Sequence, residues 1–158
     1  MVLRNQRAQL VPTLRIKWEL VIDMRALEQI VESVDASVED DYRKCMLIFL
    51  GCLSLVKDDL PETGLNAFNL AEQYWKKGDM EPGKLDEARI SCWEYLDSNN
   101  VPASPIEKRD CALRALICVL YPDQPSDDIG ELTECFFEFI EQIEVDNQSI
   151  DNIVKRII

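Results

Sequence analysis

Carboxylates recur at helical spacing near the end of the chain, where they could bind a cationic partner. At 100° per residue, Glu131, Glu134 and the next two glutamates fall within an arc of about 80° on a helix. Between positions 126 and 154 the chain has nine acidic residues and no Lys or Arg, so these charges repel one another. Phe137 projects between this acidic face and the apolar stripe, where we expect its ring to be at least partly exposed. The candidate partner-binding residues are Asp127, Glu131, Glu134, Phe137, Glu138 and Glu141.

This face has more than one chemical interpretation. An exposed aromatic ring beside carboxylates is typical of a protein-binding hot spot, although a charged helix face can also be merely solvated. A catalytic alternative exists because Glu131-x-x-Glu134 and Glu138-x-x-Glu141 match the spacing that places two metal ligands one turn apart. All-α nucleotide pyrophosphohydrolases use such acids for magnesium, but their carboxylates converge from two or more helices, whereas these four share one predicted helix. We therefore expect no metal site and no cofactor, and a metal-dependent nucleotide hydrolase is the alternative.

The sequence lacks several residues and motifs on which common catalytic sites depend. It has no histidine, which excludes Ser-His and Cys-His catalysis and the commonest metal ligand. Its six cysteines include no C-x-x-C pair, and its five glycines form no phosphate-binding motif. Cys45 and Cys52, like Cys111 and Cys118, lie seven residues apart among aliphatic residues. We therefore expect buried thiols in a reducing compartment and no catalytic residue.

The composition is that of one acidic globular domain. Of 158 residues, 47% are hydrophobic and 30% are charged, which is enough for one core without a metal or a disulfide. The net charge of −13 disfavours nucleic acid and anionic membranes as partners and favours a basic protein. The longest apolar run, 45–56, is too short to span a bilayer, and the first residues lack the features of a signal peptide. We expect a cytoplasmic protein.

Residues 1–17 differ from the rest of the chain. They carry Arg4, Arg7, Arg15 and Lys17 ahead of the first acidic residue, Glu19. Four cations in front of so acidic a body are expected to pair within the molecule rather than to bind nucleic acid. The segment is expected to be irregular or to form a short strand or helix.

From Trp18 onwards, apolar residues recur every three or four positions, which predicts helices almost throughout. A first helix covers 20–34, and a capping box of Ser37 and Asp40 is expected to open a second helix, 38–57. This second helix is apolar on nearly every side, so we expect it at the centre of a bundle.

Further helices follow from their capping signals. Ser104 and Pro105 are expected at the N-cap and first position of a helix with Glu107 as its third residue, and Ser126 is expected to cap the acidic helix. A last segment, 150–158, is expected to pack back on the domain. We predict a single all-α domain over residues 1–158, a bundle of about seven helices with a central αα-hairpin.

The hairpin carries a resemblance to a known family. Its first arm, AFNLAEQYWKKG at 67–78, has the pattern AxxxAxxYWxxG, and its second arm, LDEARISCWEYLD at 85–97, has the pattern LxxARxxxW. Together, over about 30 residues, they resemble the central motif of a family of all-helical bacterial immunity proteins, which are encoded beside polymorphic or contact-dependent toxins. The resemblance implies a small cytoplasmic protein that blocks a cognate toxin domain by stoichiometric occlusion and has no chemistry of its own. It transfers no binding surface.

The charge of the chain adds to this expectation. A carboxylate face suits the capture of a basic toxin such as a nuclease, because opposite charges steer the two proteins together. A helical adapter or scaffold that binds an unrelated basic protein is the second alternative.

Overall fold

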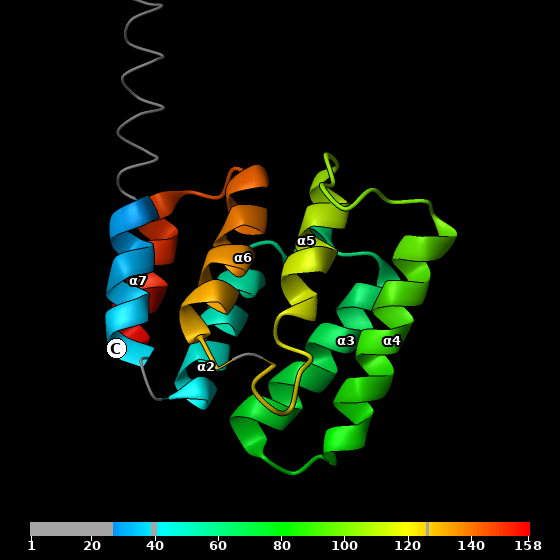
Figure 1. Ribbon diagram of the computed structural model, residues 1–158, viewed down its shortest axis with the longest axis horizontal. Coiled ribbons are helices and arrows are strands. Elements are labelled where there is room, and N and C mark those ends of the chain that lie inside the picture. The colour runs from blue at the N-terminus through cyan, green and yellow to red at the C-terminus, as the bar shows by residue number, and fades with distance from the viewer. Residues whose placement is uncertain (1–26, 39–40, 126) are drawn as a thin grey trace, which may run out of the picture.

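Every regular element is helical in the computed structural model, which describes residues 27–38, 41–125 and 127–158 (Figure 1). Within these residues the prediction of a single all-α domain with seven helices is confirmed. Two short helical turns, η1 and η2, interrupt or extend the longer helices. The elements in chain order are a helical segment at 27–38, α2 (Tyr42–Ser54), η1 (Lys57–Asp59), α3 (Glu62–Glu72), η2 (Gln73–Lys77), α4 (Pro82–Ser98), α5 (Lys108–Ile117), α6 (Ile129–Gln142) and α7 (Asn147–Ile157).

Helix α2 lies at the centre of the bundle, as its apolar sequence predicts. It contacts α3, η2, α5, α6 and α7, and side chains on most of its circumference are buried. Its approach to α7 is close, because a Cβ atom at Gly51 would lie 2.5 Å from Cγ2 of Ile153. The predicted return of the last segment is confirmed, since Ile153, Val154 and Ile157 of α7 all pack on the core.

The predicted hairpin is formed by α3, η2 and α4. Small residues at its interface, such as Ala67, Ala71 and Ala88, are buried and let the two arms approach closely. The first arm ends in a single π-helical turn, and Gly78 stops it with a left-handed φ of 69° that glycine adopts without steric cost.

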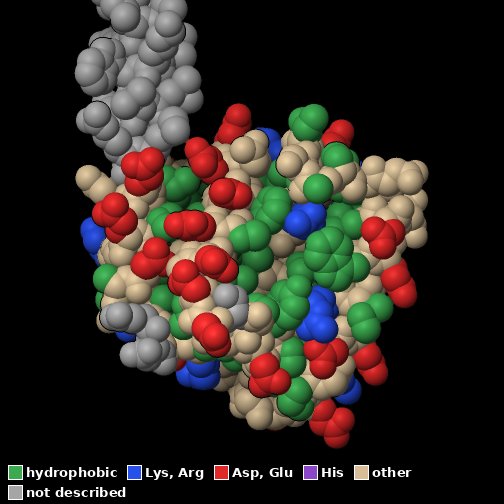
Figure 2. Space-filling view, in the orientation of Figure 1, with side chains coloured by type: hydrophobic (Ala, Val, Ile, Leu, Met, Phe, Trp, Pro, Cys, Tyr) green, Lys and Arg blue, Asp and Glu red, His purple; other side chains and the backbone are tan. Residues whose placement is uncertain are grey.

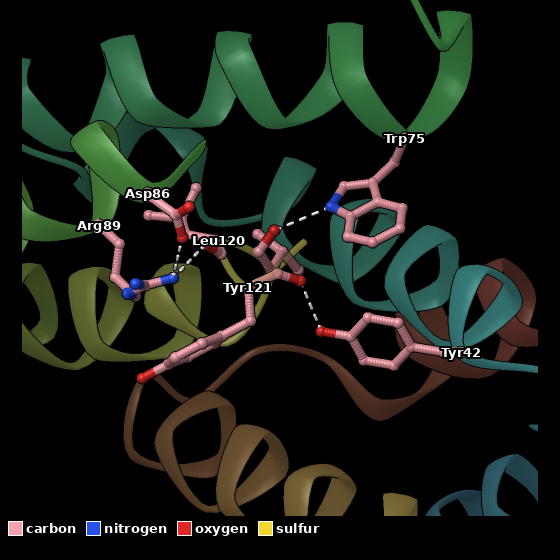
Figure 3. A network of polar contacts seen from close by, with 7 residues as sticks. Tyr42, Trp75, Asp86, Arg89, Leu120 and Tyr121 are labelled. Atoms are coloured by element: carbon pink, nitrogen blue, oxygen red, sulfur yellow. Dashed lines mark hydrogen bonds and ion pairs between the residues drawn. The ribbon is translucent and has the colours of Figure 1, made fainter. Parts of the chain in front are cut away.

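Side chains from three different helices hold the backbone at 119–121, just after α5 (Figure 3). Each of them donates one hydrogen bond to a carbonyl that follows α5, and these carbonyls are buried or partly buried, so they need such partners. The three bonds run from Tyr42 Oη to Tyr121 O (2.7 Å), from Trp75 Nε1 to Val119 O (2.8 Å) and from Arg89 Nη1 to Leu120 O (3.1 Å). They tie α2, η2 and α4 to the end of α5.

The predicted capping box at the start of the central helix is wrong. The preceding helix continues through Val38, and the Ser37 hydroxyl donates a hydrogen bond back to the Val34 carbonyl (2.9 Å). The N-cap of α2 is Asp41, whose carboxylate accepts a hydrogen bond from the Lys44 amide (3.0 Å). Position 40 lies outside the described residues.

The predicted start of α5 is also wrong, by three residues. The helix begins at Lys108 with Glu107 as its N-cap, and Ser104 is an exposed loop residue. Pro105 is buried instead of opening the helix, and its carbonyl accepts a hydrogen bond from the Cys111 thiol (3.3 Å). Tertiary packing of the loop therefore overrides the local capping signal.

Other expectations meet the structure in different ways. The acidic helix α6 begins after Asp128, which accepts a hydrogen bond from the Gly130 amide (2.9 Å), while position 126 lies outside the described residues. The predictions for residues 1–17, including the internal pairing of their basic side chains, also lie outside the described residues.

Five of the six cysteines are buried as expected, and Cys135 is partly exposed. In the part of the chain that the structure describes, no helix has both the length and the apolar character needed to cross a membrane.

Candidate partner-binding site

An open groove of about 410 Å³ lies between the helical segment 27–38 and α6. Its walls are acidic, because each of the two helices contributes three carboxylates, and its floor is apolar. The acidic residues are Glu28, Glu32 and Asp35 from the first wall and Glu134, Glu138 and Glu141 from α6; the apolar ones are Leu27, Val31 and Phe137.

Local sequence places these carboxylates on the facing sides of the two helices. Glu28, Glu32 and Asp35 are spaced by four and three residues, as are Glu134, Glu138 and Glu141, so each set forms a row along one helix face. Neither the 27–38 segment nor α6 contains a Lys or an Arg. Figure 2 shows acidic side chains crowded over this part of the surface, with few basic ones among them. The groove is therefore a concentrated patch of negative potential.

The structure brings four of the six predicted residues to the groove. The carboxylates of Glu134, Glu138 and Glu141 are exposed and line it, as does Phe137. Asp127 and Glu131 are exposed too, but they lie beyond its lining, near the start of α6. The acidic face predicted from helical spacing is thus a real surface feature, and its C-terminal half forms one wall of the groove.

The expectation that Phe137 is partly exposed is wrong. Its side chain is only 2% exposed and makes edge-on ring contacts with Phe49 (centroids 6.1 Å apart) and Phe136 (5.2 Å). Helical spacing alone placed Phe137 between the acidic face and the apolar stripe of a single helix. In the structure the segment 27–38 lies across the groove from this position and limits the access of solvent to the ring. Phe137 belongs to the core beneath the groove, so a partner would meet the carboxylates before it met this ring.

Sequence reasoning missed the opposite wall. Glu28, Glu32 and Asp35 stand between the apolar positions that predict the first helix or directly after them, but nothing in the local pattern says which other helix they will face. Their spacing was the available signal, since acidic rows on two helices can combine only if the helices pack next to each other. The pairing of these two helices is a property of the tertiary structure.

Asp35 is the most perturbed carboxyl of the groove. Partial burial raises its pKa above the usual 3.8, a hydrogen bond with Thr133 opposes that rise, and the charges of Glu134 and Asp128 add to it. Its Oδ1 atom is buried without a hydrogen-bond partner among the described residues. A carboxylate in this situation gains more from an incoming cationic donor than an exposed one does, because the donor satisfies the oxygen and offsets the neighbouring charges.

The chemistry of the groove favours binding of a cation-bearing group. Among the described residues, no Lys or Arg forms an ion pair with Glu134, Glu138 or Glu141. Nowhere in the described part of the chain do three or more His, Cys, Asp or Glu side chains form a cluster that could hold a metal ion. A long basic side chain fits such a groove, since its aliphatic stem can lie on Leu27 and Val31 while its charged end meets the carboxylates.

Comparison with protein-family models, with curated proteins and with solved structures gave no match for this chain.

Proposed function

We propose that this protein is an immunity protein that binds a cognate bacterial toxin domain inside the cell and neutralises it by stoichiometric occlusion. The observation that carries the proposal is the groove between 27–38 and α6, where six carboxylates from two helices face one another with no basic residue in either segment. A groove of this kind is complementary to a basic protein surface such as that of a nuclease, whose active site must itself attract phosphates. The resemblance of the α3–α4 hairpin to immunity proteins supports the same function.

Binding would draw on two different physical effects. The long-range field of the acidic surface accelerates encounter with a basic partner, and this effect weakens as salt screens the charges. Once the surfaces meet, Arg or Lys side chains of the toxin enter the groove, where partial desolvation strengthens their hydrogen bonds to Asp35 and its neighbours. The toxin is inhibited because the surface that it presents to an anionic substrate is covered.

Growth rescue by charge-reversed variants tests the proposal. If the proposal holds, a toxin domain is encoded beside this chain; the domain encoded by the neighbouring gene is expressed in a sensitive host together with the wild type or with Glu134→Lys/Glu138→Lys, which reverses two charges on one wall. The matched control is Glu87→Lys/Glu94→Lys, which makes the same change in net charge on exposed positions of α4, outside the groove. We expect rescue by the wild type and the control, and loss of rescue by the groove variant at equal helicity and melting temperature.

The outcomes separate the proposal from its competitors. Rescue by all three proteins would remove this groove as the contact surface, and failure of the wild type to rescue would remove the immunity function. Calorimetric titration with Mg²⁺ provides an independent check, because a metal-dependent hydrolase should bind the ion saturably and lose this binding after Glu134→Gln/Glu138→Gln. We expect no saturable heat from the wild type.

A further inference from the structure

Two cysteine side chains meet where the end of α5 packs against α6. Cys135, on α6, is the only cysteine of the chain that is not buried, and Cys118, just after the last residue of α5, is only 5% exposed. Cys118 and Cys135 lie next to each other across the contact between the end of α5 and α6, and each shifts the pKa of the other. The Cys118 thiol donates a hydrogen bond to the Arg114 carbonyl, at 3.8 Å. A partly exposed sulfur, that of Cys135, therefore lies next to a buried one, that of Cys118.

A fixed positive charge lies beside this pair. Arg114 is one turn before Cys118 on α5, and its guanidinium is held between two aromatic rings, 4.8 Å from the centroid of Trp93 and 5.0 Å from that of Phe139. Its Nη1 also donates a hydrogen bond to the Ala103 carbonyl (3.3 Å). Phe139 follows Cys135 by one turn of α6. The guanidinium of Arg114 and the two thiols therefore lie about one helical turn apart in the contact between α5 and α6.

These neighbours favour a thiolate on Cys135 and a thiol on Cys118. The hydrogen bond from Cys118 and the charge of Arg114 lower the pKa of Cys135 to about 7, against the opposing effects of partial burial and of Glu138. The pKa of Cys118 is raised well above 9.0 by its bond to Cys135 and by burial, and Cys45 on α2 contributes to this rise. Near neutral pH a substantial fraction of Cys135 is therefore ionised, whereas the buried Cys118 keeps its proton.

The remaining cysteines have the opposite character. Burial raises the pKa of Cys45, Cys52 and Cys92 to about 12, and it also raises that of Cys111. The thiolate is the reactive form of cysteine. Because these four thiols are buried and remain protonated, they should react more slowly than Cys135.

We propose that Cys135 and Cys118 are a hydroperoxide-sensitive thiol pair, in which Cys135 is the attacking and Cys118 the resolving sulfur. The Cys135 thiolate attacks the hydroxyl oxygen of the hydroperoxide, the O–O bond breaks, and the other oxygen takes a proton from solvent and leaves as water or an alcohol. This step oxidises Cys135 to a sulfenic acid. The Cys118 sulfur then attacks the Cys135 sulfur, the S–O bond breaks, and the hydroxyl leaves as water with the Cys118 proton. The net change oxidises two thiols to a disulfide between α5 and α6 and reduces one peroxide.

This modification site is separate from the groove. On α6, Phe137 and the groove lie to one side of the row formed by Glu134 and Glu138, whereas Cys135 and Phe139 lie on the flank that faces α5. The inference therefore does not rest on the proposed function, and each can fail without the other.

Selective alkylation tests the first part of the inference. The reduced, native full chain is treated briefly with iodoacetamide at several values between about pH 6 and 8, and each cysteine is quantified by peptide mass spectrometry. We expect Cys135 to be labelled at least about tenfold faster than any buried cysteine, with a rate that rises through neutral pH. Cys118→Ala removes the hydrogen-bond donor and should slow the labelling of Cys135 at pH 7. Equal labelling of all six cysteines, or faster labelling of a buried one, would overturn the inference.

Oxidation with hydrogen peroxide tests the second part. In the wild type we expect loss of two free thiols and recovery of a peptide that links Cys118 to Cys135, both reversed by dithiothreitol. Cys118→Ala should stop at a sulfenic acid on Cys135 that dimedone traps, and Cys135→Ala should keep its remaining thiols. Cys92→Ala, which removes a buried cysteine of α4, is the matched control and should form the disulfide like the wild type. If the wild type is overoxidised at Cys135 without the linked peptide, Cys118 is not a resolving cysteine and the pair is rejected.

Discussion

The rings of Phe49 and Phe136 stack face to face, with centroids 4.0 Å apart and planes inclined by 7°. Phe49 lies on the central helix α2 and Phe136 on the acidic helix α6, and both side chains are fully buried. Phe137 adds an edge-on contact to the Phe49 ring. This aromatic group fixes α6 on the core, and so determines where the carboxylates of Glu134 and Glu138 stand.

Removal of the stacked ring should destabilise the protein strongly. Phe136→Ala deletes a fully buried aromatic side chain and leaves a cavity against Phe49, so the free energy of unfolding should fall by about 3–5 kcal/mol. Urea denaturation followed by circular dichroism measures this loss. As a control, Glu138→Gln on the exposed face of the same helix should stay within about 0.5 kcal/mol of the wild type. Similar stabilities of the two variants would contradict this role of the ring.

The hydrogen bond between Tyr42 and the Tyr121 carbonyl should contribute measurably to stability. Tyr42→Phe keeps the ring, which packs edge-on against Trp75, and deletes only the donor at 2.7 Å from the carbonyl. We expect a loss of about 0.5–1.5 kcal/mol in the free energy of unfolding, measured in urea. Tyr95→Phe makes the same change on a half-buried tyrosine of α4 and should cost less. An unchanged free energy of unfolding in Tyr42→Phe would show that this hydrogen bond does not stabilise the 119–121 backbone.

The raised pKa of Asp35 predicts a specific dependence of stability on pH. An acid with a higher pKa in the folded state holds its proton more tightly there than in the unfolded chain, where the value is near 3.8. As the pH rises above 3.8, the unfolded carboxyl ionises first, so the free energy of unfolding decreases until the folded carboxyl has also ionised. Asp35→Asn has no carboxyl at this position and therefore does not show this decrease in the free energy of unfolding. Its stability relative to the wild type should therefore improve as the pH rises through this window.

Urea denaturation of both proteins over a series of pH values measures this difference. Glu134→Gln provides a second test, because it removes one of the charges that raise the Asp35 pKa and should narrow the window. If the stabilities of the wild type and Asp35→Asn change in parallel above pH 3.8, the fold does not raise the pKa of Asp35.

The close contact between α2 and α7 should make Gly51 intolerant of a side chain. A Cβ atom there would lie 2.5 Å from the Ile153 side chain, so we expect Gly51→Ala to lower the free energy of unfolding by about 1–3 kcal/mol. At Gly83 on α4 a Cβ atom would meet no other atom within 4 Å, and Gly83→Ala should raise stability by about 0.4–1 kcal/mol. In a double-mutant cycle, Ile153→Ala should reduce the cost of Gly51→Ala. Independent, additive effects would show that the two residues do not meet.

Local patterns in the sequence were sufficient to predict much of the fold. Helical periodicity depends only on neighbours along the chain, and it predicted the seven helices, the central position of α2, the α3–α4 hairpin and the exposed carboxylates of α6. Helix starts were predicted less well. Ser37 and Ser104 have capping sequences, but the first lies inside a helix and the second in a loop anchored by Pro105, because packing outweighs the energy of one cap.

The sequence by itself determined a helical, acidic chain with a carboxylate row on its sixth helix. Only the tertiary structure decided that a second acidic row faces it, that Phe137 is buried between them, and that Cys118 meets Cys135 on the other flank. The reason is geometric: each side chain's direction on its own helix follows from 3.6 residues per turn, whereas the identity of the neighbouring helix depends on how all the apolar faces pack together.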